Sequence, residues 1–162
     1  MRTLAFISLL ALTACGDRPS PTQPSPVANT GPIILSLEAE TGSGDGGSMQ
    51  RSRASGGLTV HLAPGEFRQW TVVVDAAQAQ YAVAVTYSND NVGNTETLSI
   101  LIDGTLFGAL EARDTGDDGE GWNAFVTDFA GRVPLARGTH TIAIRSNGGD
   151  GCVEIDKVTL TP

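Results

Sequence analysis

The sequence predicts an all-β fold, a β-sandwich built from antiparallel sheets, and three observations predict it. Short runs rich in Val, Ile, Leu and Thr recur along the chain, and each ends at Gly, Pro, Asn or Asp. Several of these runs alternate apolar and polar residues with a period of two, as a strand with one buried face does. Long helices are not visible from Ile33 onward. Many short strands without helices between them pack as two face-to-face sheets.

The first segment, residues 1–14, has the pattern of a secretory leader. Arg2 provides a positive start, an apolar stretch runs from Leu4 to Leu12, and small residues precede Cys15. A membrane span needs roughly 20 apolar residues, about twice the length of this stretch. Leu12-Thr13-Ala14-Cys15 resembles the lipobox of bacterial lipoproteins. The resemblance implies a lipid on Cys15 and an extracytoplasmic protein, anchored to a membrane in the periplasm or at the cell surface.

Residues 15–32 form the second segment, which is polar and rich in Pro and Ser. Such a composition cannot bury a core, so we expect an extended spacer between the lipidated cysteine and the folded part. Residues 33–162 are then expected to form a single domain. The predicted strands in this domain are Ile33–Glu40, Leu58–Leu62, Phe67–Asp75, Gln80–Ser88, Thr97–Asp103, Leu106–Glu111, Asn123–Phe129, Thr139–Ser146 and Cys152–Leu160.

Within these strands, alternation predicts which residues form the core. Trp70, Val72 and Val74 share one face of their strand, so Trp70 is expected inside the sandwich. Cys152 is expected as a small buried residue, because the leader uses the other cysteine and leaves no disulfide. The Gly-rich stretch Thr41–Gly57 is expected to be one long loop.

The charge balance argues against nucleic-acid binding, and the scarcity of catalytic motifs argues against an enzyme. The chain has 18 acidic and 10 basic residues, a net charge of -8, which would repel a nucleic-acid backbone. His61 and His140 both lie in strand-like alternation and are interpreted as structural or surface residues. Asp117, Asp118 and Glu120 lie close together, which leaves a hydrolase with paired carboxylates as a less favoured alternative.

Glu38 and Glu40 form a separate candidate site. Their spacing of two on a strand places both carboxylates on one face, where like charges repel. They are therefore either solvated or bridged by a hard cation that takes oxygen ligands. The spacing alone leaves both interpretations open.

The order of several short motifs resembles the carbohydrate-binding modules of families 6 and 35, calcium-containing β jelly rolls with a galactose-binding-domain-like fold. The motifs are Leu37-Glu38-Ala39-Glu40, Ala54-Ser55-Gly56-Gly57, Tyr81 to Asn89, Leu98 to Gly104, Gly121-Trp122-Asn123, Leu135 to Ile142 and Ile155-Asp156-Lys157-Val158. The resemblance implies a structural Ca²⁺ held by Glu38, Glu40 and Asp156.

The same resemblance implies a sugar site in which Trp122 stacks on a pyranose ring and Asn147 binds its hydroxyls. Asn123 and Asn89 are further candidate contacts. The other interpretation of Trp122 is a ring folded back as a lid on the sandwich. One departure is that the second aromatic residue of such a site, expected just after Gly57, aligns with Leu58 or Thr59.

The expected function is non-catalytic carbohydrate binding by a membrane-anchored lipoprotein. Because such modules occur attached to glycan-degrading enzymes, these enzymes and other envelope proteins are candidate partners. The alternative is a structural or protein-interaction lipoprotein of the cell envelope that keeps the jelly roll without binding sugar.

Overall fold

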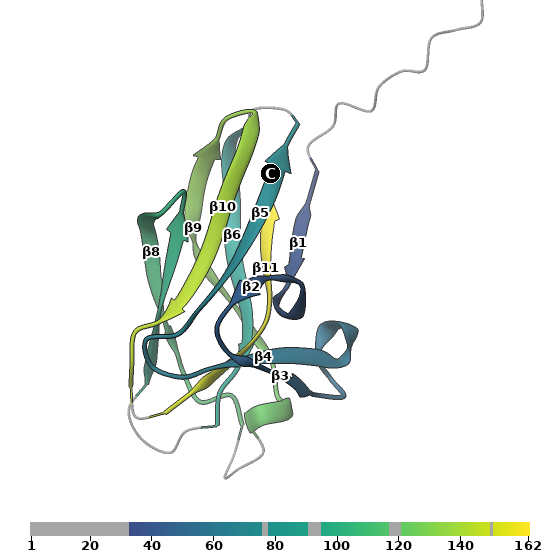
Figure 1. Ribbon diagram of the computed structural model, residues 1–162, viewed down its shortest axis with the longest axis vertical. Helices are drawn as coiled ribbons and strands as arrows, with labels where there is room; N and C mark the ends of the chain where they lie inside the picture. The colour runs from purple at the N-terminus through teal and green to yellow at the C-terminus, as the bar shows by residue number, and fades with distance from the viewer. Residues whose placement is uncertain (1–32, 76–77, 91–94, 117–120, 150) are drawn as a thin grey trace, which may run out of the picture.

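The computed structural model describes residues 33–75, 78–90, 95–116, 121–149 and 151–162. The expected leader, Cys15 and the spacer lie outside these ranges, and so do Asp117, Asp118 and Glu120. Within the described residues, eleven strands form two antiparallel sheets that face one another (Figure 1), which confirms the predicted all-β sandwich. The described residues contain no helix that is long and apolar enough to cross a membrane.

One sheet has six strands and the other has five. The six-stranded sheet has the order β3-β4-β11-β6-β9, and β1 also pairs with β11. Its strands are β1 (Leu35–Glu38), β3 (Gly47–Gln50), β4 (Leu58–Leu62), β6 (Gln78–Ser88), β9 (Val126–Leu135) and β11 (Val153–Thr161). The five-stranded sheet has the order β2-β5-β10-β7-β8 and contains β2 (Ser43–Gly44), β5 (Phe67–Val74), β7 (Glu96–Ile102), β8 (Thr105–Ala112) and β10 (Gly138–Ser146).

The core lies between the inward faces of the two sheets. The alternation that predicts it is confirmed on β5, where Trp70, Val72 and Val74 are buried while Thr71 and Val73 are exposed. The same period of two appears on β7, where Leu98, Ile100 and Ile102 are buried. The other large core residues include Leu62, Tyr81, Val83, Val85, Tyr87, Leu98, Ile100, Ile142, Ile144, Ile155 and Leu160.

The expected loop Thr41–Gly57 is wrong in part, because it contains β2 and β3. All four residues of β3 are exposed, so apolar alternation could not reveal this strand. It forms because β4 offers a free edge, with Gly47 opposite His61 and Gln50 opposite Leu58. The chain between β3 and β4 includes the 3-10 turn η2 (Ser55–Gly57).

Other strand boundaries also differ from the prediction, three of them at Glu40, Asn123 and Cys152. The first strand ends at Glu38, and Glu40 lies in the 3-10 turn η1 (Ala39–Thr41) rather than on the strand. Asn123 lies in a third turn, η3 (Gly121–Asn123), and β9 runs on to Leu135 along a sheet edge, where Pro134 is tolerated. Cys152 precedes β11 and is only partly buried, so it is not the core residue expected.

Candidate functional site

Trp122 lies in η3, at the end of the sandwich where β3 and β4 pair (Figure 1). Its side chain is neither fully buried nor fully exposed. The ring of His61 on β4 lies against it, with 5.4 Å between centroids and 48° between planes. The guanidinium carbon of Arg51 lies 5.9 Å from the Trp122 ring centroid, close enough for a cation–π contact. The indole therefore covers a charged group on one side.

That charged group is half of an ion pair with Glu154 on β11, whose side chain has no exposed surface. Arg51 binds the carboxylate through both Nε (2.7 Å) and Nη2 (2.5 Å). Thr59 donates to the same carboxylate at 2.8 Å, and His61 Nδ1 lies 3.5 Å from it. The hydrogen bond from Arg51 to Glu154 raises the pKa of the Arg51 guanidinium. These contacts compensate a carboxylate that would otherwise be costly to bury.

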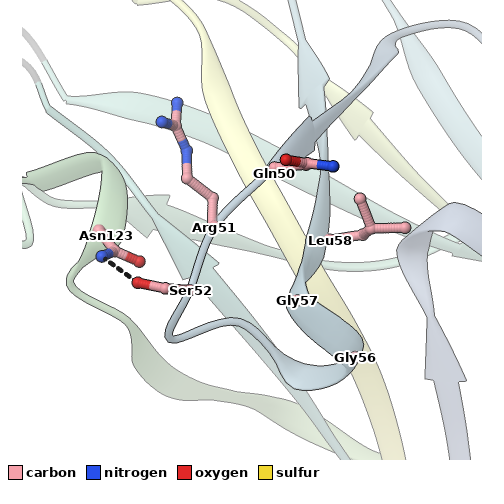
Figure 2. Close-up of a pocket in the computed structure, with 7 residues that line it drawn as sticks. All are labelled: Gln50, Arg51, Ser52, Gly56, Gly57, Leu58 and Asn123. Carbon is pink, nitrogen blue, oxygen red and sulfur yellow. Dashed lines mark hydrogen bonds between the residues drawn. The ribbon is translucent and has the colours of Figure 1, made fainter.

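A surface depression of about 690 Å³ lies beside this ion pair. Figure 2 shows Arg51 extending from the chain between β3 and η2, with Ser52 and Asn123 on one side and Gln50 and Leu58 on the other. Asn123 joins η3 to this wall, because its Nδ2 donates to Ser52 Oγ at 3.0 Å and its Oδ1 accepts from Arg53 N at 3.1 Å. The lining residues are Gln50, Arg51, Ser52, Gly56, Gly57, Leu58 and Asn123.

Of the expected sugar contacts, Asn123 lines the depression, and Trp122 lies against Arg51 in its wall without lining it. Asn147 and Asn89 do not line it either. Asn147 follows β10, is exposed, and donates from Nδ2 to Ser99 Oγ at 2.7 Å. Asn89 is fully buried and donates to the carbonyl of Ala112 at 2.7 Å and to the carboxylate of Glu96. In this structure Asn89 has no surface to offer a ligand, so we leave it out of the site.

The sequence alone did not reveal that Arg51 and His61 contact Trp122, or that Arg51 pairs with Glu154. One signal was available, because Glu154 is a charged residue within the apolar run from Val153 to Ile155, and a buried charge requires a partner. The identity of that partner depends on β3, the strand that alternation could not reveal.

The expected cation ligands meet at the η2 turn. Ser55 Oγ donates to Glu38 Oε1 at 3.1 Å, and Ser55 N donates to Asp156 Oδ1 at 2.8 Å. Lys157 Nζ donates to Ser55 Oγ at 3.1 Å. The second carboxylate oxygens of Glu38 and Glu40 are both buried and have no hydrogen-bond partner among the described residues.

The pKa of Asp156 reflects this arrangement. Burial, together with the charges of Glu38 and Glu40, raises the pKa of the Asp156 carboxyl to about 6, although the Ser55 N–H and Lys157 lower it. The described residues contain no group of three or more His, Cys, Asp or Glu side chains arranged to hold a metal ion by themselves. The two orphaned carboxylate oxygens nevertheless match the donor chemistry of a hard cation, which also takes backbone oxygens and water as ligands.

Comparison with known protein families decides the identity of the fold. The family model described as carbohydrate binding module (family 6) matches residues 38–162. The chain belongs to this family. No curated protein matches the chain.

Solved structures with the same fold include two family 35 carbohydrate-binding modules. The module from Clostridium thermocellum has a TM-score of 0.67 at 18% identity, and covers 79% of this chain and 97% of its own. The module of Abf62 from Cellvibrio japonicus also has a TM-score of 0.67 at 18% identity, and covers 80% of this chain and 94% of its own. These likenesses confirm the jelly-roll sandwich for the family 6 module.

A larger protein contains the same fold as one of its parts. The cycloisomaltooligosaccharide glucanotransferase of Paenibacillus, in complex with cycloisomaltoheptaose, matches with a TM-score of 0.67 and 23% identity. The match covers 78% of this module and 18% of that enzyme. The fold can therefore stand as a unit within a carbohydrate-active enzyme.

Proposed function

We propose that the module binds a carbohydrate without cleaving it, at the surface around Trp122. The match of residues 38–162 to carbohydrate binding module family 6 carries this proposal.

The surroundings of Trp122 offer both kinds of contact that a sugar uses. The accessible part of the indole is a flat apolar surface for the C–H groups of a pyranose ring. Arg51, Ser52 and Asn123 present polar groups beside it that can bind hydroxyls. A concave surface with a few placed polar groups is the usual form of a ligand site. Asn147 remains in the proposal as a separate contact from the chain after β10.

The test is a glycan-array screen of the chain, followed by Trp122→Ala. We expect the variant to lose binding because the stacking surface is removed. Phe129→Ala is the matched control, since Phe129 is an exposed aromatic residue, 62% accessible, on β9. Loss of binding in both variants, or in neither, would contradict the assignment. Binding only to another envelope protein would favour the protein-interaction alternative, and release of reducing sugar would favour a hydrolase.

We also propose that Glu38, Glu40 and Asp156 bind one structural Ca²⁺. Family 6 and 35 modules bind calcium in general, and the orphaned Glu38 Oε2 and Glu40 Oε2 support a cation here. Calcium takes six to eight oxygen ligands, so backbone carbonyls and water would complete the set. Isothermal titration with Ca²⁺ tests this site, and Asp156→Asn is expected to weaken binding. No heat of binding in the wild type would exclude the site.

The leader pattern supports a third proposal, that the mature chain is anchored by lipid on Cys15. We expect the protein to fractionate with membranes and Cys15→Ser to move it to the soluble fraction. Incorporation of labelled palmitate into the wild type but not into the variant would support the lipid. A wild-type protein found wholly in the soluble fraction would exclude it.

A further inference from the structure

Arg68 on β5 holds the backbone of the segment that follows β1. Its guanidinium donates to four carbonyl oxygens, those of Ala39 at 2.9 Å, Glu40 at 3.3 Å, Asp45 at 3.2 Å and Gly44 at 3.4 Å. A planar fork of donors can reach several acceptors at once, which a lysine ammonium on a flexible stem cannot do in the same way. One side chain of the five-stranded sheet therefore fixes the path of residues 39–45.

Trp70, two residues further along β5, holds the start of the same segment. Its Nε1 donates to the carbonyl of Glu38 at 2.9 Å, and only 5% of the residue is exposed. A Cβ at Gly42 would lie 2.9 Å from Nε1 and 3.0 Å from Cε2 of the indole, so the backbone rests directly on the ring. Glycine is required here by close approach.

These contacts fix the backbone while the acidic side chains face other partners. Glu38 Oε1 accepts from Ser55 Oγ in η2, and the Glu40 carboxylate lies next to Gly56, whose ideal Cβ position is 3.2 Å from Glu40 Oε1. The four hydrogen bonds of the Arg68 guanidinium all go to carbonyl oxygens. Its positive charge thus holds the segment without neutralising either carboxylate by direct pairing.

We propose that Arg68 and Trp70 are positioning residues of the cation site: they anchor the backbone at Glu38 and Glu40 so that both carboxylates converge on the η2 turn. This inference rests on the calcium site proposed above. In this role β5 contributes no ligand but sets the geometry of the site. The third ligand, Asp156, lies on β11 in the other sheet. Groups that orient metal ligands typically change metal affinity when they are removed.

The direction in which Arg68→Gln changes Ca²⁺ affinity distinguishes a positioning role from a simple effect of charge. Arg68→Gln removes a positive charge near a cation, which by Coulomb's law alone would tighten Ca²⁺ binding. The positioning role predicts the opposite, a Ca²⁺ dissociation constant larger by about 10-fold to 100-fold. Arg68→Lys, which keeps the charge and loses the fork, is expected to weaken binding as well. Arg145→Gln is the matched control, because Arg145 is exposed on β10.

Isothermal titration of the full chain with Ca²⁺, well below the melting temperature and with the fold checked by circular dichroism, measures these constants. Trp70→Phe provides a second variant, since it keeps an aromatic ring in the core and removes the bond to the Glu38 carbonyl. It is expected to weaken Ca²⁺ binding even if Arg68→Gln does not fold. Wild-type affinity in both Trp70→Phe and Arg68→Lys, or tighter binding in Arg68→Gln, would overturn the positioning role and leave the calcium site intact. A wild type that binds no Ca²⁺ would overturn both.

Discussion

Arg51 and Glu154 form a costly charge pair, because the Glu154 side chain has no exposed surface. Arg51→Ala would leave that carboxylate with Thr59 and His61 as its partners in the described part of the chain. Breaking a buried pair on one side leaves an uncompensated charge, and we expect the free energy of unfolding to fall by about 3 kcal/mol. Urea denaturation followed by tryptophan fluorescence measures the loss.

The double variant Arg51→Met with Glu154→Leu is the control for this prediction. It removes both charges and fills the space with apolar groups, so it is expected to recover most of the stability lost in the single variant. A single variant as stable as the wild type would contradict the burial of Glu154. A double variant less stable than the single variant would contradict the attribution of the loss to an unpaired charge.

His140 provides a second prediction for a single residue. Its Nδ1 lies 2.7 Å from Asp103 Oδ2 and its Nε2 lies 2.9 Å from the carbonyl of Ala136, so both ring nitrogens face acceptors and the doubly protonated ring fits best. The hydrogen bond with Asp103 raises the pKa of His140, and the same bond lowers the pKa of Asp103. The raised pKa stabilises the fold below the unfolded pKa of histidine, and this stability is lost as pH rises through the folded pKa.

We therefore expect the stability advantage of the wild type over His140→Gln to shrink as pH rises from roughly 6 to 8. The change is expected to be less than about 1 kcal/mol, because the pair is partly exposed and solvent screens it. Thermal melts of both proteins across this range measure the difference. Asp103 acts in the opposite direction, and its stabilisation is lost only as pH falls below the usual range for an aspartate. If the stabilities of the two proteins change with pH in parallel, the His140–Asp103 pair does not cause the pH dependence.

At the scale of elements, the η3 turn owes its place to a close contact with the chain after β6. A Cβ at Gly121 would clash with the carbonyl oxygen of Asn89 and lie 2.8 Å from Asp90 Cα, and backbone atoms cannot give way easily. Gly121→Ala is expected to displace η3 with Trp122 and Asn123, to cost about 1–3 kcal/mol of stability by overpacking, and to weaken sugar binding. Urea denaturation and glycan titration measure the two effects.

Gly47→Ala is the matched control at this scale. Gly47 lies in β3, and a Cβ there would meet no atom within 4 Å. We expect its stability to stay within about 0.5 kcal/mol of the wild type, as for most surface changes, with sugar binding unchanged. Equal effects of the two alanines would show that the contact at Gly121 does not position the turn.

The elements also show how far the sequence could lead. Alternation predicted β5 and its buried Trp70, because one face of that strand meets the core and the other meets solvent. It could not predict β3, whose four residues are all exposed and which pairs only at a sheet edge. Arg51 follows β3, so its partnership with Glu154 depends on a pairing that leaves no apolar pattern in the sequence.

The expected cation ligands illustrate a different limit. Their spacing predicts that Glu38 and Glu40 lie on one face of a strand, yet the strand ends at Glu38 and Glu40 lies in the 3-10 turn instead. Both carboxylates keep a buried oxygen without a hydrogen-bond partner among the described residues, but the strand pattern missed the geometry that joins them. That geometry depends on hydrogen bonds from β5, far along the chain, which local periodicity cannot encode.

For the whole molecule, the proposed cation would join the first and last strands of the domain. Glu38 ends β1, Glu40 lies in η1, and Asp156 lies on β11, which pairs with β1 and β6 in the six-stranded sheet. A ligand present at 100 times its dissociation constant stabilises the state that binds it by about 2.7 kcal/mol. For amides that exchange by local opening of the site, this corresponds to exchange slower by about 100-fold.

Hydrogen exchange with Ca²⁺ and with a chelator therefore tests how the domain is held together. We expect Ca²⁺ to slow exchange in β1 and η1, whose opening separates Glu38 and Glu40 from Asp156, and to leave the β7–β8 hairpin unchanged, because that hairpin lies at the edge of the other sheet. The amides of β7 and β8 are the internal control in the same sample. Equal slowing in all strands would mean that Ca²⁺ acts only on global unfolding, and no slowing in β1 would remove the cation from the junction of the first and last strands.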